Sequence, residues 1–207
     1  MNLVTIENYW NKLFLKPSVN QAEFDLYLKI LKTARSDEFF KNAEAVVDVG
    51  CRNWSYVSAL SQTFPKAVLH GVELDASRRY WTLHRREDFA RAYASQAEET
   101  HSKAVYFHAM DFCHSPLATW LEARNSAVFS FLFPFVSEKP CVKWGIPKEH
   151  ANFKRLLNKV LNETKSIEKR MIVSCHQGDW EADAAHDFYE SVGITKRTET
   201  KARVDYP

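Results

Sequence analysis

Two stretches decide the fold, AEAVVDVGCRNW at residues 43–54 and AVLHGVELD at residues 67–75. Each is an apolar run, the first ending in Asp48-Val49-Gly50 and the second in Gly71-Val72-Glu73, and one helix length separates them. Strand, tight turn, helix, strand and acid is the layout of a nucleotide-binding βαβ unit. A small residue at the turn lets backbone N–H groups approach a ligand, and an acid at the second strand end holds ribose hydroxyls. The two stretches therefore predict a ligand site where both strands end.

The composition fits one soluble globular unit of 207 residues, 45% hydrophobic and 26% charged. No apolar stretch approaches the roughly 20 residues of a membrane span, and no signal peptide is visible, so we expect a cytoplasmic protein without a membrane partner. The four cysteines show no CxxC spacing, which predicts free thiols and no metal site. A net charge of +2 allows RNA as a partner but does not indicate it, and the oligomeric state stays open.

The hydrophobic pattern alternates between strands and helices after an N-terminal helical cap at residues 1–44. The remaining residues, 45–207, are predicted as one Rossmann-like unit, an α/β doubly wound and mostly parallel sheet covered on both faces. The predicted helices are 5–16, 20–40, 54–64, 76–96, 116–123, 147–164 and 180–191, the last closed by Gly193. The predicted strands are 45–49, 67–73, 104–110, 127–135, 171–175 and a last strand or ragged hairpin at 194–204.

The turn after the first predicted strand carries a family resemblance. Asp48-Val49-Gly50-Cys51 resembles the opening of the first motif of class I S-adenosylmethionine-dependent methyltransferases, an Asp-x-Gly-x-Gly-x-Gly pattern. Arg52 and Trp54 stand where the second and third glycines are expected. Three arrangements stay open for Arg52: it folds outward, it meets the carboxylate of the cofactor, or it blocks the pocket.

The resemblance implies S-adenosyl-L-methionine as the cofactor and assigns further residues to it. Glu73 follows the turn by roughly the 20 residues typical of a ribose-binding acid, and Asp75 is a weaker candidate for the same role. Asp111, at the end of the third predicted strand, would accept from the adenine amino group, and Phe112 would pack against the ring. The predicted cofactor-binding set is Asp48, Gly50, Cys51, Glu73, Leu74, Asp111 and Phe112.

Two later strand ends bear on the methyl acceptor. Amino-group methyltransferases often carry Asp or Asn before Pro-Pro and an aromatic after strand four. Here only Pro134 and aromatic residues are present, so the polar group that would accept the substrate amine is absent unless Ser137 or Glu138 supplies it. After the fifth predicted strand, His176 and Asp179 are the predicted catalytic acid/base residues. Phe133-Pro134, together with residues 179–181, resembles the tRNA guanine-N7 methyltransferase branch.

Each candidate also has a plainer interpretation. Gly50 suits the turn of any doubly wound sheet, and Asp111 suits a cap on the following helix. The arginines between residues 78 and 86 suit a solvated helix face with partners such as Glu87 and Asp88. The sequence thus favours a methyltransferase acting on a small molecule or RNA, and its alternative is a non-catalytic methyltransferase-like scaffold that binds a partner protein or RNA.

Overall fold

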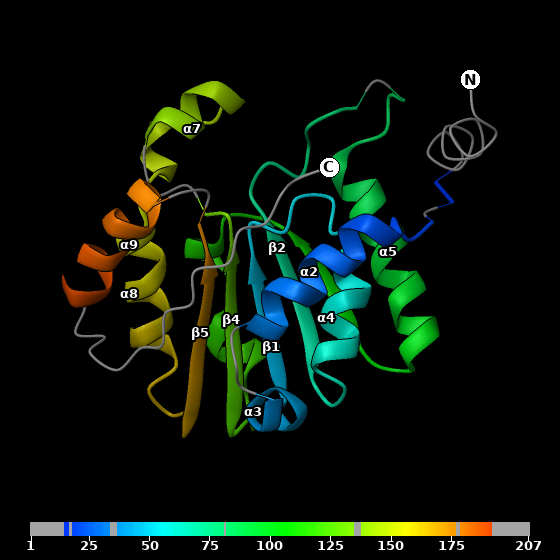
Figure 1. Cartoon of the computed structure of the whole chain (residues 1–207), viewed down its shortest axis with the longest axis horizontal. Helices are drawn as coiled ribbons and strands as arrows, with labels where there is room; N and C mark the ends of the chain where they lie inside the picture. Colours follow the sequence, from blue (N-terminus) through cyan, green and yellow to red (C-terminus); the bar gives the residue numbers. More distant parts are fainter. Residues whose placement is uncertain are drawn as a thin grey trace.

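The chain folds around a five-stranded sheet in which every strand pair is parallel (Figure 1). The computed structural model describes residues 15–16, 18–33, 37–80, 82–134, 138–176 and 179–191. The strand order is β3-β2-β1-β4-β5, so the chain starts in the middle of the sheet and winds outward in both directions. The strands are β1 (Ala45–Val49), β2 (Val68–Glu73), β3 (Val105–Ala109), β4 (Ser126–Leu132) and β5 (Lys169–Cys175). The predicted doubly wound parallel sheet is confirmed.

The helices fill the crossovers between these strands. Before β1 come α2 (Gln21–Thr33) and α3 (Asp37–Asn42). Between strands lie α4 (Val57–Thr63), α5 (Arg86–His101), η1 (Phe112–His114), α6 (Leu117–Trp120), α7 (Glu138–Trp144), η2 (Lys148–His150) and α8 (Phe153–Glu163), and α9 (Asp179–Ser191) follows β5. Residues 5–14 of the predicted helix 5–16, the Gly193 cap and the strand at 194–204 lie outside the described residues, and residues 15–16 are not helical.

Two apolar clusters cover the two faces of the sheet. Alternate strand residues such as Val46 and Leu69 point to one face, where they pack against α2, α4 and α5. Their neighbours, such as Val47 and Phe129, point to the other face and pack against η1, α6, α8 and α9. This alternation is the period of two that strands impose, and β1 and β4 are buried on both faces, as central parallel strands are.

The segment before α5 departs from the predicted helix 76–96. The structure places turns at residues 74–77, and an isolated antiparallel bridge pairs Arg79 with Arg85. The backbone N–H of Arg86 donates to the carbonyl of Arg78 at 2.8 Å, so the helix begins only at Arg86. The helix therefore begins later than the helical pattern of charges, and Arg86 at its first position lies in a different environment from the one predicted.

The segment between β4 and β5 also differs from its prediction. The single helix expected at 147–164 is η2 followed by α8, and α7 precedes them. Pro147 stands before η2, whereas α8 begins after Asn152, whose side chain accepts from the backbone N–H of Arg155 at 2.9 Å. Capping by Asn152 therefore sets the start of α8. None of the described helices has the length and apolarity that crossing a bilayer requires.

Trp54 lies inside the core between α4 and the sheet. Its side chain is fully buried, and a Cβ built on Gly71 would come within 2.7 Å of the indole ring. Phe107 of β3 lies beside the same ring, with centroids 6.4 Å apart. The absence of a side chain on β2 at Gly71 thus makes the space that the indole fills.

We predict that Gly71→Ala lowers the free energy of unfolding by about 2 kcal/mol, because the added methyl overpacks the contact with Trp54. Chemical denaturation of a double-mutant cycle with Trp54→Phe measures the contact directly. The smaller ring leaves room for the methyl, so the penalty of Gly71→Ala should fall by about 1 kcal/mol or more in that background. An equal penalty in both backgrounds would show that Trp54 does not set the requirement for glycine.

Candidate functional site

Most of the predicted cofactor-binding residues lie where β1, β2 and β3 end. The backbone N–H groups of Gly50 and Cys51 donate to the carbonyl of Val72 at 2.8 and 3.2 Å, which ties the turn after β1 to the end of β2. The N–H of Met110 donates to the carbonyl of Glu73 at 3.1 Å, which brings the end of β3 alongside. The carboxyl ends of strands in such sheets are the usual place of ligand binding.

The turn after β1 keeps the backbone of a glycine motif with only one glycine. Gly50, Arg52 and Trp54 have φ values of 77°, 57° and 53°, and these are the three positions where the resemblance expects glycine. The left-handed conformation costs a residue with a Cβ roughly 1–2 kcal/mol. The surrounding structure therefore holds this turn in its shape at two residues that disfavour it.

Asp48 explains how the turn is held. Its carboxylate is fully buried and accepts three hydrogen bonds, from Trp54 Nε1 at 2.9 Å, Tyr56 Oη at 2.8 Å and Ser130 Oγ at 2.6 Å. Burial raises the pKa of Asp48 to about 6, although all three hydrogen bonds act to lower it. Asp48 thus binds the turn, the start of α4 and the neighbouring strand β4 to a single group.

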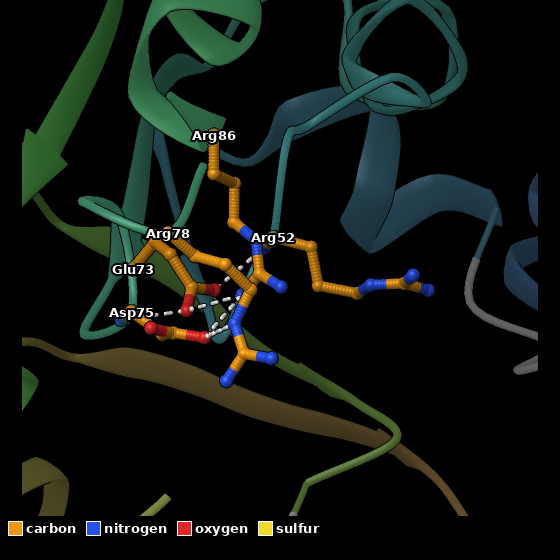
Figure 2. A network of polar contacts seen from close by, with 5 residues as sticks. All are labelled: Arg52, Glu73, Asp75, Arg78 and Arg86. Atoms are coloured by element: carbon orange, nitrogen blue, oxygen red, sulfur yellow. Dashed lines mark hydrogen bonds and ion pairs between the residues drawn. The ribbon is translucent and has the colours of Figure 1, made fainter. Parts of the chain in front are cut away.

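Glu73 lies in a buried ionic network at the end of β2 (Figure 2). Its Oε2 accepts from the backbone N–H of Arg52 at 2.7 Å, and its Oε1 accepts from the backbone N–H of Asp75 at 2.8 Å. Arg86 Nη1 lies 3.1 Å from Glu73 Oε1 and 3.3 Å from Asp75 Oδ2, and the Arg78 guanidinium also pairs with Asp75. Glu73 therefore ties the turn after β1 to the first residue of α5.

The placement of Arg86 corrects the sequence interpretation of these arginines as a solvated helix face. The Arg86 side chain is only 8% exposed. Arg85 keeps the expected kind of partner, with its Nη1 3.3 Å from Glu87 Oε1. Arg86 is an arginine of the helix start that sequence reasoning missed as a site residue. The only signal for it was that an acid at a strand end, once buried, needs a cation or several N–H donors nearby.

The side chains of Arg52 and Trp54 both point away from Glu73, in different directions. Trp54 packs into the core, as described above, so it does not fill the ligand site. The Arg52 residue is exposed, and Figure 2 shows its side chain extending away from Glu73 while its backbone nitrogen faces the carboxylate. The side chain that contacts the carboxylate of Glu73, the predicted ribose-binding acid, is therefore that of Arg86.

The remaining predicted cofactor residues are divided between the surface and the core. Leu74, beside Glu73, is 41% exposed although it is apolar. Asp111 caps η1 by accepting from the backbone N–H of Cys113 at 2.8 Å, and it also pairs with His114. Phe112 is buried against Phe131 in the core, so in this structure its ring packs inward. Their roles toward a cofactor stay predictions.

The predicted catalytic residues follow β5. His176 Nε2 lies 3.2 Å from Ser174 Oγ, which in turn bonds the hydroxyl of Tyr189 from α9. Burial lowers the pKa of His176 to about 4, so the imidazole is neutral at pH 7. Its Nδ1 is buried and has no hydrogen-bond partner within the described part of the chain. Asp179 begins α9, and neither its side chain nor Ser137 belongs to what the structure describes.

Comparisons with known proteins find likeness in structure only. No family model and no curated protein matches the chain. Precorrin-6y C5,15-methyltransferase from Geobacter metallireducens is 14% identical with a TM-score of 0.48, and the match covers 80% of this chain and 69% of that one. A METTL16 methyltransferase domain is 12% identical with a TM-score of 0.48, covering 82% of this chain and 71% of that one.

A third similar structure is the tRNA (uracil-54, C5)-methyltransferase of Pyrococcus abyssi, 14% identical with a TM-score of 0.40. The match covers 81% of this chain but only 31% of that one. These solved structures are all of methyltransferases, the class that the first motif resembles. At these identities and TM-scores, the residues of the site decide what function can be argued.

We predict that Asp48→Asn changes the pH dependence of stability. Since the pKa of Asp48 is raised from 3.8 to about 6, folding takes up a proton between these values, and the native state gains stability as the pH falls through that window. The buried charge therefore costs about 3 kcal/mol at neutral pH. Chemical denaturation at pH 7.5 and pH 4 should show the stability of Asp48→Asn, relative to the native chain, fall by a large part of that amount. Parallel pH profiles would contradict the assignment.

Proposed function

We propose that this chain is an S-adenosylmethionine-dependent methyltransferase whose cofactor binds at the ends of β1, β2 and β3. The observation that carries the proposal is the turn after β1, which adopts left-handed φ at residues 50, 52 and 54 and donates a backbone N–H to Glu73. A chain with no use for the turn would have no reason to keep two strained residues in it. The turn and the acid are the two parts of the βαβ unit that contact a nucleotide ligand.

The residues present fit the adenosine part of this cofactor in two ways. The exposed Leu74 offers an apolar surface directly beside Glu73, which suits the face of a base. The backbone of the turn approaches the end of β2 closely, since the N–H groups of Gly50 and Cys51 donate to the carbonyl of Val72, and among the described residues nothing lies within 4 Å of where a Cβ on Gly50 would stand. These features support a purine nucleoside lying across the ends of β1 and β2.

The bound cofactor would supply a methyl group on a sulfonium, which is already a good leaving group. The chain then has to hold the acceptor in line and exclude water, because proximity and alignment account for most of such catalysis. His176, which follows β5 and is neutral at pH 7, is the proposed acid/base residue of the site. The acceptor is proposed only as a small molecule or RNA.

The alternative, a non-catalytic scaffold that binds a partner protein or RNA, is favoured by one observation. Arg86 already contacts one oxygen of the Glu73 carboxylate, the group to which a ribose would have to bind. In addition, the end of β4 carries Phe133 and Pro134 in place of an amide or acid. A scaffold with this network would bind no S-adenosyl ligand.

Isothermal titration calorimetry with S-adenosylmethionine and S-adenosylhomocysteine tests the proposal, and we expect both to bind. Glu73→Gln should weaken the affinity for S-adenosylhomocysteine about 10-fold, because a charged acceptor of the ribose is lost. The exposed Glu122, in the turn after α6, provides the matched control Glu122→Gln, which should leave the affinity unchanged. Thermal melting confirms that both variants fold. Absence of binding by the native chain at millimolar ligand would overturn the proposal in favour of the scaffold.

A further inference from the structure

Glu73 has a limited capacity to accept hydrogen bonds, and most of it is used. A carboxylate offers about four lone-pair positions, two on each oxygen. Oε1 receives the backbone N–H of Asp75 at 2.8 Å and Arg86 Nη1 at 3.1 Å, so both of its positions are occupied. Oε2 receives the backbone N–H of Arg52 at 2.7 Å. One acceptor position is therefore left, on Oε2.

Arg86 is fixed in this arrangement. It is the first residue of α5, and its own backbone N–H is bonded to Arg78. Its guanidinium bridges Glu73 and Asp75, of which Glu73 is almost fully buried. Moving the guanidinium away would leave a buried carboxylate without its cation, which is strongly unfavourable. Arg86 is thus a permanent partner of Glu73.

One buried donor of Arg86 also lacks a partner among the described residues. Its Nε–H is buried and has no hydrogen-bond acceptor within the residues that the structure describes. The Arg86 residue is more than nine-tenths buried. The network of Glu73 and Arg86 is therefore short of one donor, for Oε2, and of one acceptor, for Nε–H.

A single hydroxyl group donates one hydrogen bond, so one ligand hydroxyl fills the acceptor position left on Oε2. A ribose carries two neighbouring hydroxyls, and the second finds no position on Glu73. We propose that Arg86 makes this site recognise one ribose hydroxyl of its nucleoside ligand and not the other. This inference rests on the proposed function and assigns Arg86 as a specificity-determining residue.

Calorimetry with three ligands tests the inference on the full chain: S-adenosylhomocysteine and its 2′-deoxy and 3′-deoxy analogues. We expect one analogue to bind within about 2-fold of the parent and the other to lose about 10-fold or more, because a site built to bond a hydroxyl rejects a ligand that lacks it. Equal losses for both analogues, or no loss for either, would overturn the inference while the proposed function stands. If S-adenosylhomocysteine itself does not bind, the proposed function fails, and the inference falls with it.

Two variants then connect the asymmetry to Arg86. Arg86→Met frees a position on Oε1, so the analogue that was tolerated should now lose about as much affinity as the other. Arg78→Met, which breaks an ion pair to Asp75, is the matched control and should keep the asymmetry. Arg86→Lys keeps a cation beside Glu73 and should also keep the asymmetry between the two analogues. It provides a folded variant if Arg86→Met melts at working temperature. An asymmetry that survives in a folded Arg86→Met would overturn the role of Arg86.

Discussion

The buried carboxylate of Asp48 is the interaction on which the rest of the site depends. It lies in the central strand β1 and receives hydrogen bonds from the turn, from the residue before α4 and from β4. All three donors are neutral, so the carboxylate is satisfied in hydrogen bonds but not in charge. Tyr56, one of the donors, also stacks on Tyr27 of α2 with ring centroids 3.7 Å apart, which extends the same connection to the helix before the sheet.

A second carboxylate, Glu73, completes the fixing of the turn from the other side. Asp48 anchors the side chain of Trp54, whereas Glu73 anchors the backbone N–H of Arg52. Both residues have left-handed φ, and each is thus held by its own acid. A hydrogen bond to a charged acceptor contributes about 1.5–3 kcal/mol, which is comparable to the strain of one such residue. The turn can therefore hold its shape with Arg52 and Trp54 at these two positions.

The sequence predicted the sheet well because β1, β2 and β4 are apolar runs whose ends are marked by glycine, acid or proline. It placed Glu73 at the end of β2, which the register confirms, and Asp111 close to the end of β3, where it lies two residues beyond Ala109. It failed for Arg86 and for the start of α5, since helical spacing of charges does not reveal whether a neighbouring turn delays the helix. It left the direction of Trp54 open, because that depends on Gly71, a residue on another strand.

The packing of Trp54 against Gly71 leaves the Glu73–Arg86 pair as the feature that determines what the site can bind. At the third glycine position of such turns, a small residue normally allows close packing of helix on strand. Here the large residue stands in the turn and the small one on β2, so the same space is filled from the opposite side. Because the indole points inward, Trp54 does not close the candidate site. What remains at the site is the acid and its cation, so the number of acceptor positions that Arg86 leaves on Glu73 decides what the site can bind.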